Sequence, residues 1–165
     1  MPLAYSMQIQ ESNRILLPAI GGLTVSADTA RKILVVDDEL DTRIFLLNLL
    51  NAGGFLPVVA ENKIQGLRAA LEKRPSVIIL NMTMAGKDGI ELYRNLKREE
   101  GLKRIPVIML STLDKKTFLK CHTLYGVTQC EEFELYDMFM EKPPEADELI
   151  TAVRELSEKN KAVAQ

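Results

Sequence analysis

Short apolar runs and amphipathic segments alternate along most of the chain. The first run, residues 33–36, reads Ile-Leu-Val-Val without polar interruptions, which is typical of a strand covered on both faces of a parallel sheet. Residues 41–52 follow with apolar positions at helical spacing, and Gly53-Gly54 provides a stop signal. This part of the sequence therefore predicts one strand followed by one helix.

Four more strand–helix pairs follow in the same order. They are residues 55–60 with 63–73, 77–80 with 89–99, 107–110 with 115–124, and 138–140 with 145–159. Five such units predict a parallel sheet with helices on both faces. The sequence thus predicts one α/β domain over residues 31–160, followed by a short C-terminal tail at 161–165.

The first 30 residues show no sustained hydrophobic period, and residues 18–22, Pro-Ala-Ile-Gly-Gly, indicate a turn. We interpret residues 1–30 as an N-terminal extension. Its apolar side chains predict that it docks on the domain or on a partner. These side chains are Ile15, Leu16, Leu17, Leu23 and Val25.

Composition and charge narrow the range of functions. A formal net charge of −2 gives no general basic field for nucleic acid, so we expect no nucleic-acid partner. Every apolar run is much shorter than the ~20 residues that cross a bilayer, and the N-terminus lacks a signal-peptide pattern. We therefore expect a cytoplasmic protein without a membrane segment. Cys121 and Cys130 lack a metal-binding spacing and are expected to be reduced thiols.

Chemically active side chains follow the predicted strands. In an open α/β sheet, ligands bind beyond the carboxyl ends of the strands. Two adjacent acids there can hold Mg²⁺, while a hydroxyl and an ammonium can bind a phosphoryl group. The alternative is structural, with the acids capping the next helix and the lysine forming an ion pair with one of them. The residues are Asp37, Asp38, Asn81, Ser111 and Lys142.

Four sequence blocks together resemble the receiver domain of two-component response regulators over residues 31–160. The blocks are ILVVDDE at 33–39, VIILNMTMAGKDG at 77–89, PVIMLS at 106–111 and EKP at 141–143. They occur in the family's order and at the predicted strand ends. The resemblance implies a flavodoxin-like (βα)5 fold with strand order 2-1-3-4-5 and a signalling protein rather than an enzyme.

The resemblance also identifies what Asn81 replaces. In receiver domains the third strand ends in an aspartate, which accepts a phosphoryl group from the phosphohistidine of a sensor kinase. An amide is neutral and poorly nucleophilic, so ordinary aspartyl phosphorylation should fail here. Asp37, Asp38 and the carbonyl of Thr83 remain as metal ligands, and without the third acid we expect weak or absent Mg²⁺ binding and no other cofactor.

Other positions match the family or depart from it. Ser111, Phe139 and Lys142 correspond to the phosphate-switch residues, whereas Ala85 stands where receivers usually have proline, so the loop is expected to be more mobile. Residues 126–136 contain extra chain. There Phe133 lies among acids, and with Phe139 it is a candidate contact residue.

The favoured interpretation is a stand-alone, phosphorylation-independent pseudo-receiver that acts by protein–protein interaction in two-component signalling. Its expected partners are signalling proteins such as a sensor histidine kinase or another regulator, or a second copy in a homodimer. Two alternatives stay open. One is a phosphorylatable receiver of a phosphorelay in which Asn81 is an engineered change. The other is a pseudo-receiver whose modified pocket binds a small anion or metabolite.

Overall fold

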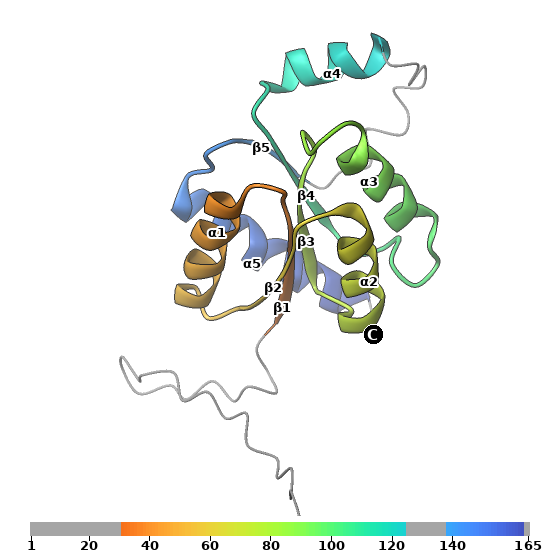
Figure 1. The fold of residues 1–165 in the computed structure, drawn as a ribbon. Helices are drawn as coiled ribbons and strands as arrows, with labels where there is room; N and C mark the ends of the chain where they lie inside the picture. The colour runs from red at the N-terminus through yellow and green to blue at the C-terminus, as the bar shows by residue number, and fades with distance from the viewer. Residues whose placement is uncertain (1–30, 125–137, 164–165) are drawn as a thin grey trace, which may run out of the picture. The chain divides into compact units, whose positions relative to one another are not determined.

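The computed structural model describes residues 31–124 and 138–163, except for the side chains of residues 119, 121–124 and 161–163 (Figure 1). Strands and helices alternate as the sequence predicts. The strands are β1 Lys32–Val36, β2 Leu56–Ala60, β3 Val77–Asn81, β4 Val107–Ser111 and β5 Met138–Glu141. The helices are α1 Leu40–Ala52, α2 Lys63–Lys73, α3 Asp88–Arg98, α4 Lys115–Leu124 and α5 Ala146–Val163.

The five strands form one parallel sheet in the order β2-β1-β3-β4-β5. The predicted flavodoxin-like topology is therefore confirmed. The register aligns the carboxyl ends of the strands, since Val36 lies opposite both Ala60 and Leu80. Ser111 likewise lies opposite Glu141. Residues that end β1, β3, β4 and β5 are thus brought to one edge of the sheet.

Two hydrophobic cores cover the two faces of the sheet, as the apolar strands predict. Leu34 and Val36 of β1 belong to the core beneath α2, α3 and α4. Ile33 and Val35 belong to the core beneath α1 and α5. In Figure 1, α2 and α3 lie on one side of the sheet and α1 and α5 on the other. Burial of each such side chain contributes roughly 1.5–3 kcal/mol, so both faces hold the strand ends in place.

The observed elements extend beyond some predicted ends. Asn81 and Ser111 are the last residues of β3 and β4, although their polarity suggested that the strands had already ended. Helix α5 continues to Val163, past residue 159, where the sequence predicted that the last helix ends. The backbone hydrogen bonds of a strand do not depend on side-chain polarity, so hydropathy alone misplaces such ends.

Three regions of the sequence interpretation lie outside the described residues. They are the extension at 1–30, the extra chain at 126–136 with Phe133 and Cys130, and the last two residues. Within ranges 31–124 and 138–163, no helix has both the length and the apolar character that crossing a membrane requires.

Candidate functional site

The carboxyl edge of the sheet holds a cluster of buried polar side chains. Asp37 follows β1, Asn81 ends β3 and Ser111 ends β4, and their exposed fractions are 1%, 2% and 0%. The Lys142 side chain, which follows β5, is 6% exposed. Buried polar groups need hydrogen-bond partners, so the contacts among these residues define what the site can bind.

Asn81 lies at the centre of the cluster, and both the NH₂ group and the oxygen of its side-chain amide form hydrogen bonds. Its Nδ2 donates to Oδ1 of Asp37 at 3.1 Å and to Oδ1 of Asp38 at 3.0 Å. Its Oδ1 accepts from the backbone N–H and the hydroxyl of Thr83, both at 2.9 Å. A backbone N–H can only donate, so the Thr83 contact fixes which end of the amide faces the acids.

Lys142 places an ammonium beside two of the acids. Its Nζ lies 2.7 Å from Oδ2 of Asp37 and 2.9 Å from Oε2 of Glu39. The sequence suggested an ion pair with Asp37 or Asp38, and the structure shows it with Asp37. The sequence analysis did not predict the contact with Glu39. Glu39 directly follows Asp37 and Asp38, and its place in this acidic run could have indicated it.

Ala85 joins the loop after β3 to the loop after β1. Its backbone N–H donates to Oδ2 of Asp38 at 3.3 Å. A proline at this position has no N–H and could not make this bond. The departure from the receiver pattern at Ala85 therefore adds a contact, which the expectation of a more mobile loop did not consider.

Ser111 and Phe139 have local structural partners. Ser111 Oγ accepts from the backbone N–H of Leu113 at 3.0 Å, so the hydroxyl stabilises the turn that follows its own strand. The ring of Phe139 lies 5.5 Å from that of Phe118 on α4, centroid to centroid, and packs against the core. Phe139 is half-buried, so its role as a contact residue stays a prediction.

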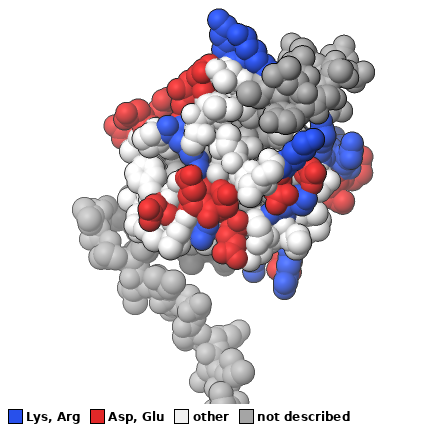
Figure 2. All heavy atoms as spheres, turned by 45° about the horizontal axis from the view of Figure 1, so that its top comes forward, with Lys and Arg blue, Asp and Glu red and all other residues white. Residues whose placement is uncertain are grey.

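Arg43 supports the same edge and was also missed. It donates to the backbone carbonyl of Asp37 at 2.7 Å and lies 3.8 Å from the carboxylate of Glu61. It thereby ties α1 to the loop after β1 and to the loop after β2. Figure 2 shows acidic side chains gathered on this face of the molecule.

The acids do not present a Mg²⁺ site in this arrangement. Each of their four oxygens already has a partner, because Asp37 meets Asn81, Lys142 and the N–H of Glu39, and Asp38 meets Asn81 and Ala85. Mg²⁺ needs free carboxylate or carbonyl oxygens, whereas Asn81 aims its NH₂ at both acids. Across the described residues, no three acidic, thiol or imidazole groups are arranged to hold a metal. The residues present therefore do not fit the ion.

Glu39 gives the site a pH-dependent contact. The hydrogen bond from Lys142, then the one from Thr42 and the charge of Lys142, lower the pKa of Glu39 below its ordinary value of 4.5. A lowered pKa in the folded state stabilises the protein above pH 4.5, and this stability is lost as pH falls through the folded-state pKa.

We expect Glu39→Gln to reduce the free energy of unfolding at neutral pH by no more than about 1 kcal/mol, because the side chain is more than half exposed to solvent. Urea unfolding measured along a pH series checks this. The difference from the wild type should vanish in acid, and a difference that persists there would contradict the contact.

Comparison with known proteins identifies the family. Residues 33–154 match the model of the response regulator receiver domain. The chain belongs to this family. Receiver domains act in two-component signalling and interact with sensor histidine kinases and other signalling proteins.

Individual relatives support the assignment over parts of their length. The receiver domain is 39% identical over 82 residues to the phosphate regulon transcriptional regulatory protein PhoB of Escherichia coli, a match that covers 50% of this chain and 36% of PhoB. It is 34% identical over 84 residues to sporulation initiation phosphotransferase F of Bacillus subtilis, covering 50% of this chain and 68% of that protein. The chain thus spans about a third of PhoB, and the expectation of no nucleic-acid partner stays a prediction.

A solved structure agrees with the topology. The signal receiver domain of a histidine kinase from Syntrophus aciditrophicus superposes with a TM-score of 0.65 at 28% identity, covering 79% of this chain and 92% of that one. The sheet order and the helices on both faces are therefore those of the family.

Proposed function

We propose that this receiver domain acts by binding other signalling proteins and does not accept a phosphoryl group at the end of β3. The single observation that carries the proposal is the bonding of Asn81. Both of its N–H groups donate to acids, and its oxygen accepts two hydrogen bonds from Thr83. Residue 81 thus has neither the charge of a nucleophile nor a free lone pair for an incoming phosphorus atom.

The surrounding charges support the same proposal. In a phosphorylated site, an ammonium would neutralise the phosphoryl oxygens. Here Lys142 already contacts two carboxylates, those of Asp37 and Glu39. The acids, the amide and the ammonium therefore satisfy one another without an added metal or phosphoryl group, and they hold the loops after β1, β3 and β5 in one arrangement.

Helix α1 offers a surface for a protein partner. It buries Leu46 and Leu50 but also exposes Leu40, Ile44 and Phe45, with exposed fractions of 60%, 49% and 42%. A helix that is apolar on more than its core-facing side often has a second surface that a partner covers. This surface begins at Leu40, directly after Asp37, Asp38 and Glu39. The contacts of these three acids therefore fix the start of the helix that would contact the partner.

Incubation with Mg²⁺ and acetyl phosphate, followed by mass spectrometry of the intact protein, tests the proposal. We expect no phosphoryl adduct on the wild-type chain, because the residue at 81 is an amide. Asn81→Asp supplies the missing carboxylate, and an adduct on this variant alone would show that the other site residues still support the reaction.

The opposite outcome is equally clear. A phosphoryl adduct on the wild-type chain would overturn the proposal, and peptide mapping would then identify the acceptor. The matched control is Asn48→Asp on the exposed side of α1, which adds the same carboxylate far from the acids of the site and should gain no adduct.

A further inference from the structure

The carboxylate of Asp38 has a hydrogen-bond donor on each of its two oxygens. Oδ1 accepts from Nδ2 of Asn81 at 3.0 Å, and Oδ2 accepts from the backbone N–H of Ala85 at 3.3 Å. The first donor belongs to a side chain and the second to the backbone. A substitution of Asn81 therefore releases only one oxygen of Asp38, and the other oxygen keeps its donor.

The loop between β3 and α3 carries Ala85 and is fixed at both ends. Near its start, Met82 and Met84 are each 3% exposed and pack into the core beneath α2, α3 and α4. At its end, a Cβ on Gly89 would come within 2.5 Å of the backbone oxygen of Asn81, so the start of α3 lies close against the end of β3. The loop that presents the Ala85 N–H to the acids thus has little room to shift.

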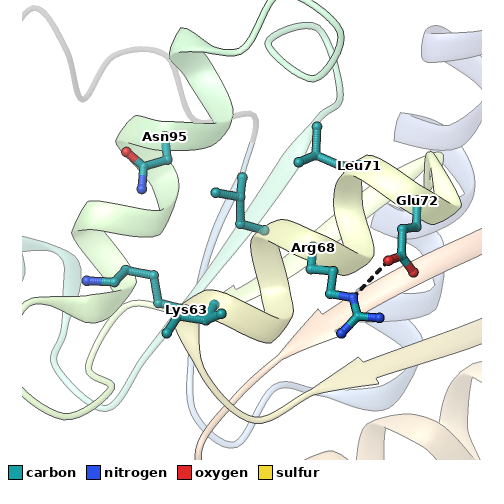
Figure 3. Close-up of a pocket in the computed structure, with 7 residues that line it drawn as sticks. Lys63, Arg68, Leu71, Glu72 and Asn95 are labelled. Atoms are coloured by element: carbon teal, nitrogen blue, oxygen red, sulfur yellow. Dashed lines mark hydrogen bonds and ion pairs between the residues drawn. The ribbon is translucent and has the colours of Figure 1, made fainter.

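A lysine of α2 also holds the start of α3. Lys63 lies 3.2 Å from Asp88 and contacts Glu91, and both acids belong to the first turn of α3. Figure 3 shows Lys63 at the start of α2, with its side chain extended toward α3. Partly exposed ion pairs contribute little energy each. Here they add to the packing at Gly89, so α2 helps to fix the end of the loop.

We propose that the Ala85 N–H is a second restraint on the acids of the site, which limits cation binding even when residue 81 is a carboxylate. Mg²⁺ binds oxygens in a nearly ideal octahedral geometry, so a carboxylate has to turn to meet it. A donor on Oδ2 of Asp38 occupies a lone pair and opposes that movement. Proline at 85 has no N–H and removes the restraint. The inference rests on the proposed function and deepens it, because it names a second residue that keeps the site without a metal.

Titration of the full chain with Mg²⁺, followed by NMR, tests the inference in four variants. They are Asn81→Asp, its double variants with Ala85→Pro and with Ala85→Gly, and Ala85→Pro alone. We expect Ala85→Pro to tighten Mg²⁺ binding by Asn81→Asp about fivefold, the effect of one net hydrogen bond. Ala85→Gly keeps the N–H and should give no gain. Ala85→Pro alone should not bind Mg²⁺, because Asn81 still donates to both acids.

Hydrogen exchange of the Ala85 amide measures the same contact without a change at residue 85. We expect this amide to exchange slowly in the wild type and in Asn81→Asp, because Asp38 accepts from it in both. In Asp38→Ala the acceptor is absent, so the amide should exchange several-fold faster. Circular dichroism confirms that the variants are folded, and the exchange rates decide the question if the proline variant does not fold.

Three results would overturn the inference. An equal gain from Ala85→Pro and Ala85→Gly would assign the effect to the flexibility of the loop. Unchanged or absent Mg²⁺ binding in Asn81→Asp with Ala85→Pro would show that the N–H does not limit the site. Equal exchange in the wild type and in Asp38→Ala would exclude the contact itself. None of these results depends on whether acetyl phosphate modifies the wild-type chain, so failure of the proposed function would be seen separately.

Discussion

Asn81→Asp is expected to destabilise the protein strongly in the absence of divalent metal. The change removes the two N–H donors that lie 3.1 and 3.0 Å from Asp37 and Asp38 and puts a third carboxylate in their place. Lost hydrogen bonds to charged groups cost roughly 1.5–3 kcal/mol each, and like charges add to the cost. We expect a loss of at least about 3 kcal/mol at neutral pH, measured by urea unfolding with a chelator present.

Mg²⁺ should reverse much of this loss in the variant and have little effect on the wild type. Three carboxylates form a site that the cation favours, and a ligand at ten times its Kd stabilises the folded state by about 1.4 kcal/mol. Asn48→Asp is again the control, because it should change stability by less than about 0.5 kcal/mol with or without Mg²⁺. A variant as stable as the wild type in chelator would show that Asn81 does not hold the acids together.

The fold could be predicted from sequence because the strands are nearly continuous apolar runs. Ile33 to Val36 and Val77 to Leu80 are covered on both faces, and a parallel sheet is the usual structure in which this occurs. The predicted bounds of α2 and α4 agree with the structure. The errors fell at the ends of elements: Asn81 and Ser111 keep the backbone geometry of a strand but carry polar side chains, and α5 continues to Val163.

The positions of the site residues could be predicted, but not all of their contacts. Residues that follow parallel strands meet at one edge, so Asp37, Asn81 and Lys142 were expected to lie close together. The contact between Lys142 and Glu39 joins residues 103 positions apart and depends on how a long side chain turns. The hydrogen bond from Ala85 uses a backbone N–H, and a residue pattern does not show where a backbone group points.

The exposed side of α2 shows another limit of prediction from the sequence. Its sequence contains two large apolar residues that stay exposed, Ile64 and Leu71, and a small buried pair, Gly66 and Ala70. Helical periodicity alone would place the larger set inside, since it buries more apolar area. The close approach of α2 to Val36 and Leu92 reverses this order, and such an approach is a property of the packed sheet and helices.

Lys142→Met is the second change with a large expected effect. The ammonium is nearly buried and lies 2.7 Å from Asp37, which is itself 1% exposed on its side chain. Methionine fills similar space without a charge, so Asp37 loses its counter-ion and stays buried. Breaking a buried ion pair by removing one partner costs roughly 3–5 kcal/mol. We expect about 3 kcal/mol here in urea unfolding, because Asp37 keeps the donors from Asn81 and Glu39.

Three further measurements separate this ion pair from a general effect of losing a lysine. Lys120→Met removes an exposed lysine of α4 and should cost less than about 0.5 kcal/mol. The double variant Asp37→Asn with Lys142→Met removes both charges and should be more stable than the single Lys142→Met variant, with a coupling energy of about 1–3 kcal/mol. Lys142 is also the largest cause of the lowered pKa of Glu39, so in Lys142→Met that pKa should return toward its ordinary value in an NMR titration. A single variant that costs under about 1 kcal/mol, or a pKa of Glu39 that does not rise, would mean that the carboxylates of the site do not depend on this ammonium.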